Sequence, residues 1–398
     1  MLSDVDTADI ASVVSAASSD LIELSHSIHG EPELAFAEFK SSAKLIELLT
    51  QRGFEVRTEV AGLPTAFEAS FGSGDLVIGV CAEYDALPEI GHACGHNVIA
   101  AAAVGAGLAL AEFADRHAIT VRVIGTPAEE SGGGKILMLD AGVFDDVAAA
   151  LMVHPGPEDI VGVRSLALAD LAIAFTGREA HASAAPEFGR NAADAVTVAQ
   201  VGLGLLRQHL APGQQLHGIV SDGGIAPNIV PGHAEMLYYL RARSTASLEQ
   251  LRERAEACFA AGAMAAGCSF DIRTVAPTYT ELTPDAELAD AYRSEITAMG
   301  RTPLAPGLEG LRPLGSTDMG NVTNVLPGIH PVIGIDSGGA VTHQPGFAAA
   351  SVNASADRAV LDGAQALART VIRVLSEESS RERLAAGVAV RANARAGR

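Results

Sequence analysis

The feature that most constrains the fold of this chain is a repeated order of apolar strand, polar loop and helix. Apolar runs at residues 76–82, 120–125 and 148–153 predict strands, and a fourth follows at 331–335. Helical patterns at 98–113 and from 132 to 140 separate the first three strands. Such alternation is typical of the α/β fold class, with a mixed, mostly parallel sheet and helices on both of its faces.

Each predicted strand is followed by residues that can bind a metal ion or carry a proton. They are Asp85, Cys94 and His96 after the first strand, Glu129 and Glu130 after the second, His154 after the third and His343 after the last. The carboxyl ends of parallel strands share one edge of a sheet, where ligands collect. Thiolate, imidazole and carboxylate groups are the donors that transition metals prefer, so this edge is a predicted metal site.

Taken singly, these residues have plainer interpretations. Cys94 and His96 alone fit a turn with a core cysteine and a surface histidine, and Glu129-Glu130 alone fits a solvated acidic pair. Their convergence favours the metal site, where one glutamate could bind an ion while its neighbour points at the bound water. Asn97 is expected to cap the helix that follows.

Between residues 166 and 279 the pattern changes. Strands are predicted at 169–176, 216–220, 233–242 and 270–275, with helices at 191–209 and 248–266. This β-α-β-β-α-β order is the ferredoxin-like α+β arrangement. We therefore expect an inserted lid domain over 167–282, between two parts of a catalytic domain at 1–166 and 283–398. A long helix at 355–376 closes that domain, and the arginine-rich tail at 381–398 is expected to fray.

Charge and cysteine content limit the partners of the protein. The 48 acidic residues outnumber 27 basic ones, and the net charge of −21 argues against nucleic acid as a partner. Four cysteines in 398 residues form no disulfide framework. From the acidic beginning of the sequence we expect no signal peptide, and the apolar run at 98–111 falls short of the ~18 residues that span a membrane. A cytoplasmic protein without a membrane partner is expected.

Other catalytic motifs are absent from the sequence. The stretch SGGGK at 131–135 lacks the spacing of a phosphate-binding loop, and Ile136 stands where such a loop needs Ser or Thr. Neither glycine pair, at 105–107 or 202–204, has the third glycine of a dinucleotide fingerprint. No G-x-S-x-G elbow of a serine hydrolase occurs. A phosphate-binding transferase that uses SGGGK and GSTDMG is the remaining alternative. It would need a nucleotide site, and the sequence shows none.

Seven stretches together resemble the two-metal aminoacylase and carboxypeptidase family. They are AEYDALPEIGHACGHN, GTPAEESGGGK, MVHPG, AHASAAPEFGRNAADA, APNIVPGHAEMLYYLRA, GSTDMGNVT and THQPGF. Within that metallopeptidase family the chain is most similar to the amidohydrolase branch, which holds auxin-conjugate hydrolases, aminobenzoyl-glutamate hydrolases and related dipeptidases. The AEYDALP form resembles the aminobenzoyl-glutamate hydrolase and basic-dipeptide dipeptidase group.

The resemblance implies two divalent ions per chain, with zinc first and manganese or cobalt as alternatives. It implies a bridging thiolate and four further ligands, which would be Cys94 as the bridge and His96, Glu130, His154 and His343. Glu129 would be the general base, and Asp85 the acid that orients a ligand. Carboxypeptidase-type members have His-x-Asp and a bridging Asp where this chain has Glu83-x-Asp85 and a cysteine, so the identity of the metal stays open.

In the lid, the resemblance implies that His181 reaches the active site of a partner in a homodimer formed through the lid. Asn228 and Arg241 would hold the carboxylate of the substrate, and in a hairpin-like layout they could share one edge of the lid. The expected function is hydrolysis of the amide bond in N-acyl amino acids, aminobenzoyl-glutamate-like conjugates or dipeptides with a free carboxylate. The alternative is a non-catalytic metal or carboxylate sensor, which would not need a base such as Glu129.

Overall fold

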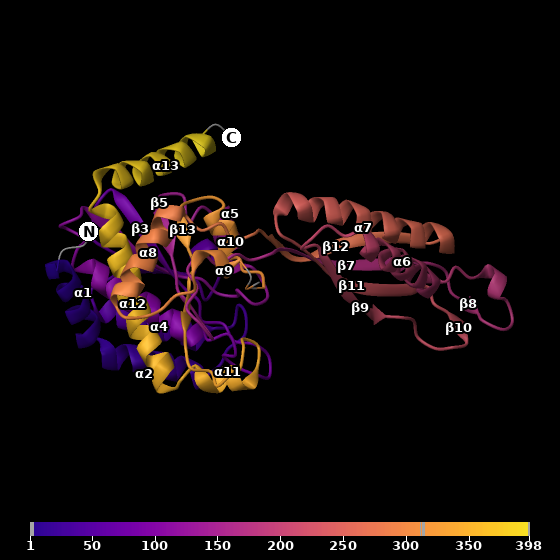
Figure 1. Cartoon of the computed structure of the whole chain (residues 1–398). Coiled ribbons are helices and arrows are strands. Elements are labelled where there is room, and N and C mark those ends of the chain that lie inside the picture. The colour runs from indigo at the N-terminus through magenta and orange to yellow at the C-terminus, as the bar shows by residue number, and fades with distance from the viewer. Residues whose placement is uncertain (1–3, 311, 313–314, 397–398) are drawn as a thin grey trace. The chain divides into compact units, whose positions relative to one another are not determined.

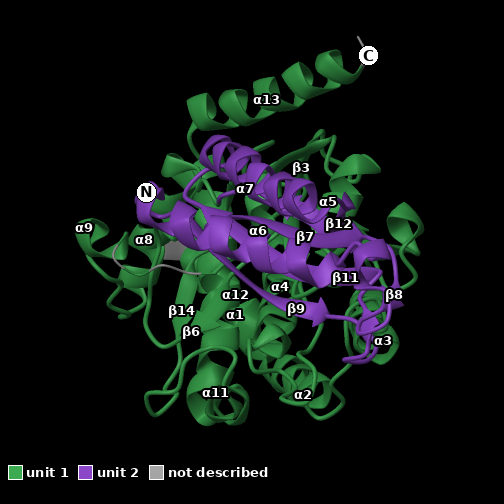
Figure 2. Ribbon diagram, turned by 90° about the vertical axis from the view of Figure 1, so that its right-hand side faces the viewer, with its two compact units in different colours: residues 1–164, 282–398 green, residues 165–281 purple. Residues whose placement is uncertain are grey.

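A computed structural model of the chain describes residues 4–310, 312 and 315–396. The chain forms two compact units, unit 1 made of Met1–Arg164 with Leu282–Arg398 and unit 2 made of Ser165–Glu281 (Figure 2). The domain boundaries expected after residues 166 and 282 lie within two residues of these limits.

Unit 1 is built on a six-stranded sheet with the order β1-β2-β4-β3-β5-β13. Its strands are β1 (Glu55–Thr58), β2 (Phe67–Phe71), β3 (Leu76–Ala82), β4 (Ile119–Gly125), β5 (Val147–Leu151) and β13 (Gly328–Ile329). β3 lies parallel to both β4 and β5, and β13 is parallel to β5. Only the β1 and β2 edge is antiparallel. The predicted mixed, mostly parallel sheet is confirmed.

The strand expected at 331–335 is present as β14 (Val332–Gly334), but it lies outside the six-stranded sheet. β13 ends the six-stranded sheet, while β14 (Val332–Gly334) pairs in parallel with β6 (His154–Gly156) in a separate two-stranded sheet. The segment continues beside its neighbour, since the backbone N–H of His154 donates to the carbonyl of Pro331 at 2.9 Å. This second pairing fixes the backbone at a predicted metal ligand.

Helices cover both faces of the unit 1 sheet (Figure 1). They are α1 (Asp4–Ala16), α2 (Ser18–His29), α3 (Phe39–Gln51), η1 (Val60–Gly62), α4 (His96–Ala111), α5 (Gly134–Asp140), α8 (Ala286–Ala298), α9 (Pro306–Glu309), α10 (Met319–Thr323), α11 (Pro345–Ala350), α12 (Ala354–Leu375) and α13 (Glu378–Ala396). Successive side chains of a strand point to opposite faces. Ile78 and Val80 of β3 accordingly join a core cluster with α4 and α12, whereas Val77 and Cys81 join one with α5 and α10.

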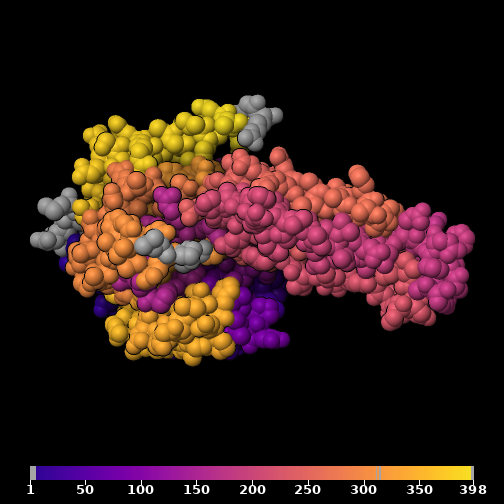
Figure 3. Space-filling view, turned by 45° about the vertical axis from the view of Figure 1, so that its right-hand side comes forward, coloured from indigo at the N-terminus to yellow at the C-terminus, as the bar shows by residue number. Residues whose placement is uncertain are grey.

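The arginine-rich tail is helical, so the expectation that it frays was wrong. α13 lies on the surface of unit 1, where Figure 3 shows it in yellow. Its arginines reach backbone carbonyls of that unit: Arg381 donates to His117 at 2.5 Å, and Arg395 donates to Leu139 at 2.9 Å. Arg383 pairs with Asp285 at 2.8 Å. Leu384 is buried in the core of unit 1 as well, and Val388 packs against that core, so apolar and polar contacts together hold the helix.

Unit 2 has the predicted ferredoxin-like fold, with two helices packed on one four-stranded antiparallel sheet. Its elements are β7 (Ala167–Thr176), β8 (Ala180–His181), η2 (Pro186–Phe188), α6 (Ala192–Leu206), η3 (Arg207–His209), β9 (Gln215–Asp222), β10 (Ile229–Val230), β11 (His233–Ala242), α7 (Thr245–Ala266) and β12 (Ser269–Tyr279). The sheet order is β12-β7-β11-β9, and all three pairings are antiparallel. Unit 2 has its own hydrophobic core between its helices and its sheet, in which Phe175 and Phe259 are fully buried.

Among the described residues, none of the helices combines the length and the apolar character needed to cross a membrane. The most apolar one, α4, is buried within unit 1 along nearly its whole length.

Candidate metal centre

The candidate metal centre lies in unit 1, where the loops after neighbouring strands meet. β4, β3 and β5 are adjacent in the sheet and parallel, so the segments that follow them leave from the same edge. The loop after β3 brings Cys94 to the start of α4 through Gly95, whose φ is +79°. A side chain at this glycine would lie 2.5 Å from the ring of Pro155, so the close approach requires glycine.

His96 is fixed by one ring nitrogen and presents the other to the site. Its Nδ1 lies 2.9 Å from Oδ1 of Asp85, and both side chains are buried. The second oxygen of Asp85 accepts a hydrogen bond from the backbone N–H of Glu130 at 3.0 Å. Because the carboxylate accepts from Nδ1, the lone pair of Nε2 is available to an ion. One acid therefore orients two predicted ligands from different strands.

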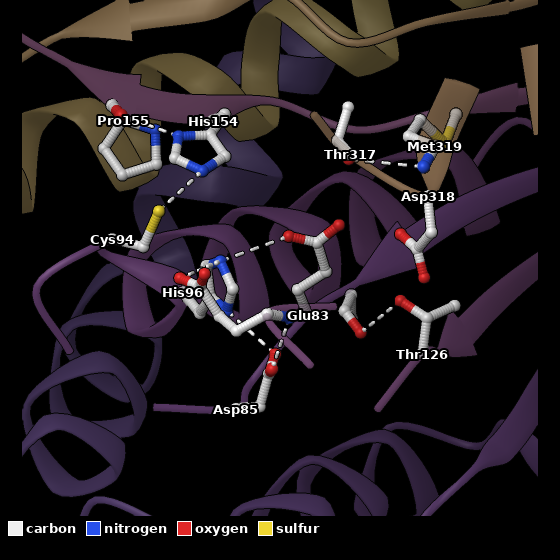
Figure 4. A network of polar contacts seen from close by, with 12 residues as sticks. Glu83, Asp85, Cys94, His96, Thr126, His154, Pro155, Thr317, Asp318 and Met319 are labelled. Atoms are coloured by element: carbon white, nitrogen blue, oxygen red, sulfur yellow. Dashed lines mark hydrogen bonds and ion pairs between the residues drawn. The ribbon is translucent and has the colours of Figure 1, made fainter. Parts of the chain in front are cut away.

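Two further pairs of predicted ligands face one another. Nδ1 of His154 lies 2.7 Å from the carbonyl of Pro155, which leaves Nε2 3.5 Å from the Cys94 sulfur (Figure 4). Nε2 of His343 lies 3.4 Å from Oε2 of Glu130. The φ of His343 is +66°, a strained backbone that its N–H stabilises by donating to the carbonyl of Ala93 at 2.9 Å.

The donor atoms fall into groups that fit metal ions. Ligand atoms within 4.8 Å of one another define three sets among the described residues: Cys94 with His96 and His154, Cys94 with Glu130 and His343, and Glu83 with His96 and Glu129. Three buried donors within these sets have no hydrogen-bond partner in the described part of the chain, namely Oε2 of Glu83, Nε2 of His96 and Oε1 of Glu130. Buried polar atoms without partners are rare, and cations bound within these sets would satisfy them. The residues present therefore fit the group that the sequence implies.

Charge is concentrated at this centre. Burial, together with the carboxylates of Glu130 and Glu129, raises the pKa of the Cys94 thiol well above its usual value of 9.0. Burial opposes the protonation of His96, yet the carboxylates of Asp85 and Glu83 raise its pKa well above 6.5. Both pKa shifts arise because negative groups are concentrated at the site. A divalent cation bound there would neutralise this charge and stabilise Cys94 as a thiolate.

Glu129 occupies a loop with an unusual backbone. Ala128, which precedes it, has a φ of +60°, and its N–H donates to the buried carboxylate of Glu38 at 2.9 Å. Burial, followed by the charges of Glu83 and Glu130, raises the pKa of Glu129 well above the ordinary 4.5. A carboxylate with a raised pKa, held near the donor atoms of His96 and Glu83, is suited to accept and return a proton.

Of the residues predicted in the lid, unit 2 brings His181 and Asn228 together but not Arg241. β8 and β10 pair Ile229 with His181, and the Asn228 carbonyl accepts from the N–H of Ala182 at 3.0 Å. Arg241 pairs with Leu168 at the other end of β11, about 26 Å along the extended strand from His233. The hairpin-like layout that would bring Asn228 and Arg241 to one edge was therefore wrong.

A buried triad that the sequence did not predict lies beside the donors. Lys135 Nζ lies 2.5 Å from Oε1 of Glu83 and 2.7 Å from Oδ1 of Asp318. All three side chains are 0% exposed. The sequence did carry a signal for Glu83, because it lies two residues before Asp85 and residues at that spacing in an extended segment point to the same side. Lys135 gave no such signal, because lysine is almost never fully buried without partners.

The cap predicted for α4 was also wrong. Asn97 lies inside the first turn, where its amide donates to the hydroxyl of Ser25 and to the carbonyl of Ser351, each at 2.9 Å. The residue at the N-cap is Gly95, which makes no side-chain hydrogen bond. Asn97 thus ties the start of α4, and with it His96, to two other segments of unit 1.

Comparison with known proteins agrees with this geometry. The model of peptidase family M20/M25/M40 matches residues 79–373. The mouse (Mus musculus) Xaa-Arg dipeptidase is 39% identical over 373 residues, which cover 88% of this chain and 85% of the relative. A component of the p-aminobenzoyl-glutamate hydrolase of Escherichia coli K12 is 38% identical over 255 residues, covering 58% of this chain and 53% of that protein.

Solved structures show the same fold at lower identity. A putative aminohydrolase from methicillin-resistant Staphylococcus aureus superposes with a TM-score of 0.76 at 21% identity, covering 93% of this chain and all of the other. A dinuclear metal-binding peptidase from Bacillus subtilis gives a TM-score of 0.68 at 22% identity, covering 91% of this chain and 99% of its own. Together with the match over residues 79–373, these comparisons show that the chain belongs to peptidase family M20/M25/M40 and is a metal-dependent amide hydrolase.

Proposed function

We propose that this enzyme cleaves the amide bond of dipeptides or N-acyl amino acids that carry a free carboxylate, using two divalent ions per chain. The observation that carries the proposal is the convergence of two sets of metal donors that share Cys94, with the buried acid Glu129 beside them. The named activities of the relatives make Xaa-Arg dipeptides and p-aminobenzoyl-glutamate the first substrates to examine.

The residues proposed to hold the ions are Cys94, His96 and His154 at one position, and Cys94, Glu130 and His343 at the other. When bound, the ions would supply Lewis-acid polarisation of the scissile carbonyl and a lower pKa for an attacking water. The thiolate and imidazole donors suit zinc, with manganese and cobalt as alternatives. Asp85 keeps His96 in the tautomer that offers Nε2, because its carboxylate accepts from Nδ1.

Glu129 is the proposed general base. It takes the proton of the attacking water on its carboxylate and then donates that proton to the nitrogen of the leaving amine. The raised pKa that burial and the nearby carboxylates give Glu129 supports both steps, because a base that must also act as an acid works best near the operating pH. Hydrolysis is completed without a covalent intermediate.

The lid residues are proposed to bind the substrate from two chains of a homodimer. His181 and Asn228 lie together at one end of unit 2, and Arg241 lies at the other end of β11. A separation of about 26 Å along the strand exceeds the length of a dipeptide, which is roughly 7 Å for two extended residues. If all three contact one substrate, the His181 end comes from one chain and Arg241 from the other.

Arg241 is the proposed partner of the substrate carboxylate. It is partly buried over the ring of Tyr239, with 5.6 Å between the guanidinium carbon and the ring centroid. Burial also lowers the pKa of Arg241 from its ordinary 12.5, as is typical of a guanidinium partly withdrawn from water. A planar guanidinium suits a carboxylate, and a protein with a net charge of −21 needs a local positive group to admit an anion.

The experiment is a comparison of free acids with their methyl esters. The acids of Xaa-Arg dipeptides or p-aminobenzoyl-glutamate should be cleaved well and the esters poorly. Arg241→Ala should lower kcat/KM for the acid by a factor that corresponds to ~2–5 kcal/mol of transition-state stabilisation, because a desolvated charge pair is lost. The loss for the ester should be much smaller. Equal hydrolysis of acid and ester by the natural protein would contradict the carboxylate requirement.

We further propose that the enzyme works in the cytoplasm. Its four cysteines are all free thiols. Free thiols persist in reducing compartments, and the proposed bridging role of Cys94 requires one.

A further inference from the structure

The buried triad of Lys135, Glu83 and Asp318 carries an uncompensated charge. One ammonium faces two carboxylates, and all three side chains are 0% exposed. The backbone N–H of Lys135 also donates to the second oxygen of Asp318 at 2.9 Å, so Asp318 is held on both oxygens. Burying a net negative charge is costly unless a cation lies nearby. The arrangement therefore calls for one more positive group close to the triad.

The open position of the triad is the second oxygen of Glu83. Its Oε1 accepts from Lys135 at 2.5 Å, whereas its Oε2 finds no hydrogen-bond partner among the described residues. Oε2 lies 3.5 Å from Nε2 of His96, which likewise lacks a partner in the described part of the chain. Figure 4 shows the His96 ring between Asp85 and Glu83. Asp85 holds Nδ1, so Nε2 is the nitrogen that faces Glu83.

The separation of these two atoms fits a shared ion better than a hydrogen bond. An N–H···O bond spans ~2.7–3.2 Å, which is shorter than the 3.5 Å found here. Donors held ~2.0–2.2 Å from one zinc ion at tetrahedral angles stand about 3.3–3.6 Å apart. The pairs already assigned to the metal centre have the same spacing, 3.5 Å for Cys94 with His154 and 3.4 Å for Glu130 with His343.

We propose that Glu83 is a further ligand of the ion at His96, and that Lys135, held by Asp318, is the positioning residue that turns the free oxygen of Glu83 toward that ion. The inference rests on the proposed function, because it requires an ion at this centre. It adds a carboxylate to the donors Cys94, His96 and His154. The ion would also supply the positive charge that the triad lacks, because Lys135 and the ion together would balance the carboxylates of Glu83 and Asp318.

The test is metal binding by the full chain after removal of bound metal with a chelator. Zinc affinity is measured by competition with a chelating dye, and cobalt(II) is added separately so that its d–d absorption reports the ligand set. The variants are Glu83→Gln, which removes the charge of the proposed ligand, and Asp318→Asn, which disturbs the same triad without touching that ligand. Glu309→Gln is the matched control, because Glu309 is a buried carboxylate that pairs with Arg293 and belongs to none of the donor sets.

Glu83→Gln should weaken the binding of one ion about 100-fold or more and shift the cobalt absorption, since the loss of an outer partner alone costs ~10–100-fold. Asp318→Asn should weaken binding no more than about tenfold and leave the cobalt spectrum in place. Glu309→Gln should match the natural protein in both. Should Glu83→Gln not fold, Glu83→Asp keeps the charge beside Lys135 but draws the oxygen back by about one bond length, ~1.5 Å, and should shift the spectrum too.

The outcomes separate this inference from the proposed function. If the natural protein binds two ions and Glu83→Gln binds them with the same affinity and cobalt spectrum, Glu83 is not a ligand while the proposed function stands. Equal changes in Glu83→Gln and Asp318→Asn would reduce the triad to a scaffold and overturn the assignment. If the natural protein binds no ion, the two-metal proposal and the Glu83 assignment fall together.

Discussion

Replacement of Lys135 by methionine should destabilise unit 1 strongly. Methionine nearly matches the length of lysine, so the core stays filled and the change removes chiefly the ammonium. That ammonium lies 2.5 Å from Glu83 and 2.7 Å from Asp318. Without it, two buried carboxylates lose their partner. Breaking a buried ion pair from one side costs ~3–5 kcal/mol, and Lys135 serves two acids, so the upper part of that range is expected.

A matched control is available near the surface. Lys44 lies 2.8 Å from Glu31, at a similar distance, but the two side chains are 26% and 47% exposed. An exposed pair contributes ~0–1 kcal/mol, so Lys44→Met should change the free energy of unfolding by that amount or less. The contrast between the two lysines isolates burial, since both substitutions replace the same residue type.

The stability loss in Lys135→Met should depend on pH. Burial raises the pKa of Asp318 to about 6 even with Lys135 beside it. Its folded pKa thus lies above the unfolded value of ~3.9, so its contribution to stability is full below pH ~3.9 and is lost as pH rises through about 6. Removing the ammonium raises that pKa further. The deficit of Lys135→Met relative to the natural protein should therefore be smaller near pH 4.5 than near pH 7.5.

The assay is urea unfolding of the metal-free protein followed by far-ultraviolet circular dichroism, because the chain has no tryptophan. Hydrogen exchange of peptides from unit 1 and unit 2 assigns each transition, with unit 2 as the internal reference. The reasoning is refuted if Lys135→Met loses no more stability than Lys44→Met at pH 7.5, or if its deficit is larger at the lower pH.

Three further predictions concern the metal centre and the lid. Glu129→Gln should keep its metal content by elemental analysis and lower kcat by ~10² or more, because a general base is lost; turnover like that of the natural protein would remove Glu129 from this role. Cys94→Ala should lose at least one ion per chain, since the thiolate is proposed to bridge both, and full occupancy would show that another group forms the bridge. Inactive His181→Ala and Glu129→Gln chains should regain partial activity after the chains of the two dimers exchange, because one mixed site receives an intact base and an intact lid histidine; no recovery after verified exchange would argue that His181 acts within its own chain.

The fold and the candidate ligands were predictable because both depend on simple periodicities. Apolar runs placed the strands, and the loops that follow neighbouring parallel strands leave the sheet at a shared edge. Cys94, His96, Glu130, His154 and His343 meet there with donor atoms a few ångströms apart. No knowledge of side-chain conformation was needed for that conclusion.

Three features required the three-dimensional structure. Lys135 is fully buried, and its partners come from the residue that follows β3 and from a segment more than a hundred residues later, which no local pattern reveals. Asn97 bonds to two distant segments instead of capping its own helix. The strand register, not the sequence spacing, separates Asn228 from Arg241. In each case the deciding contact joins residues that are far apart in the chain.

The central claim, that an ion-dependent site in unit 1 hydrolyses a dipeptide-like amide, is tested most directly by metal removal and return. Protein stripped by a chelator is assayed on Xaa-Arg dipeptides and p-aminobenzoyl-glutamate, before and after the addition of zinc, manganese or cobalt. The account predicts that activity disappears with the metal and is restored when two ions per chain are bound, but is not restored in Glu129→Gln. Undiminished hydrolysis by the metal-free protein, or full recovery in Glu129→Gln, would contradict it.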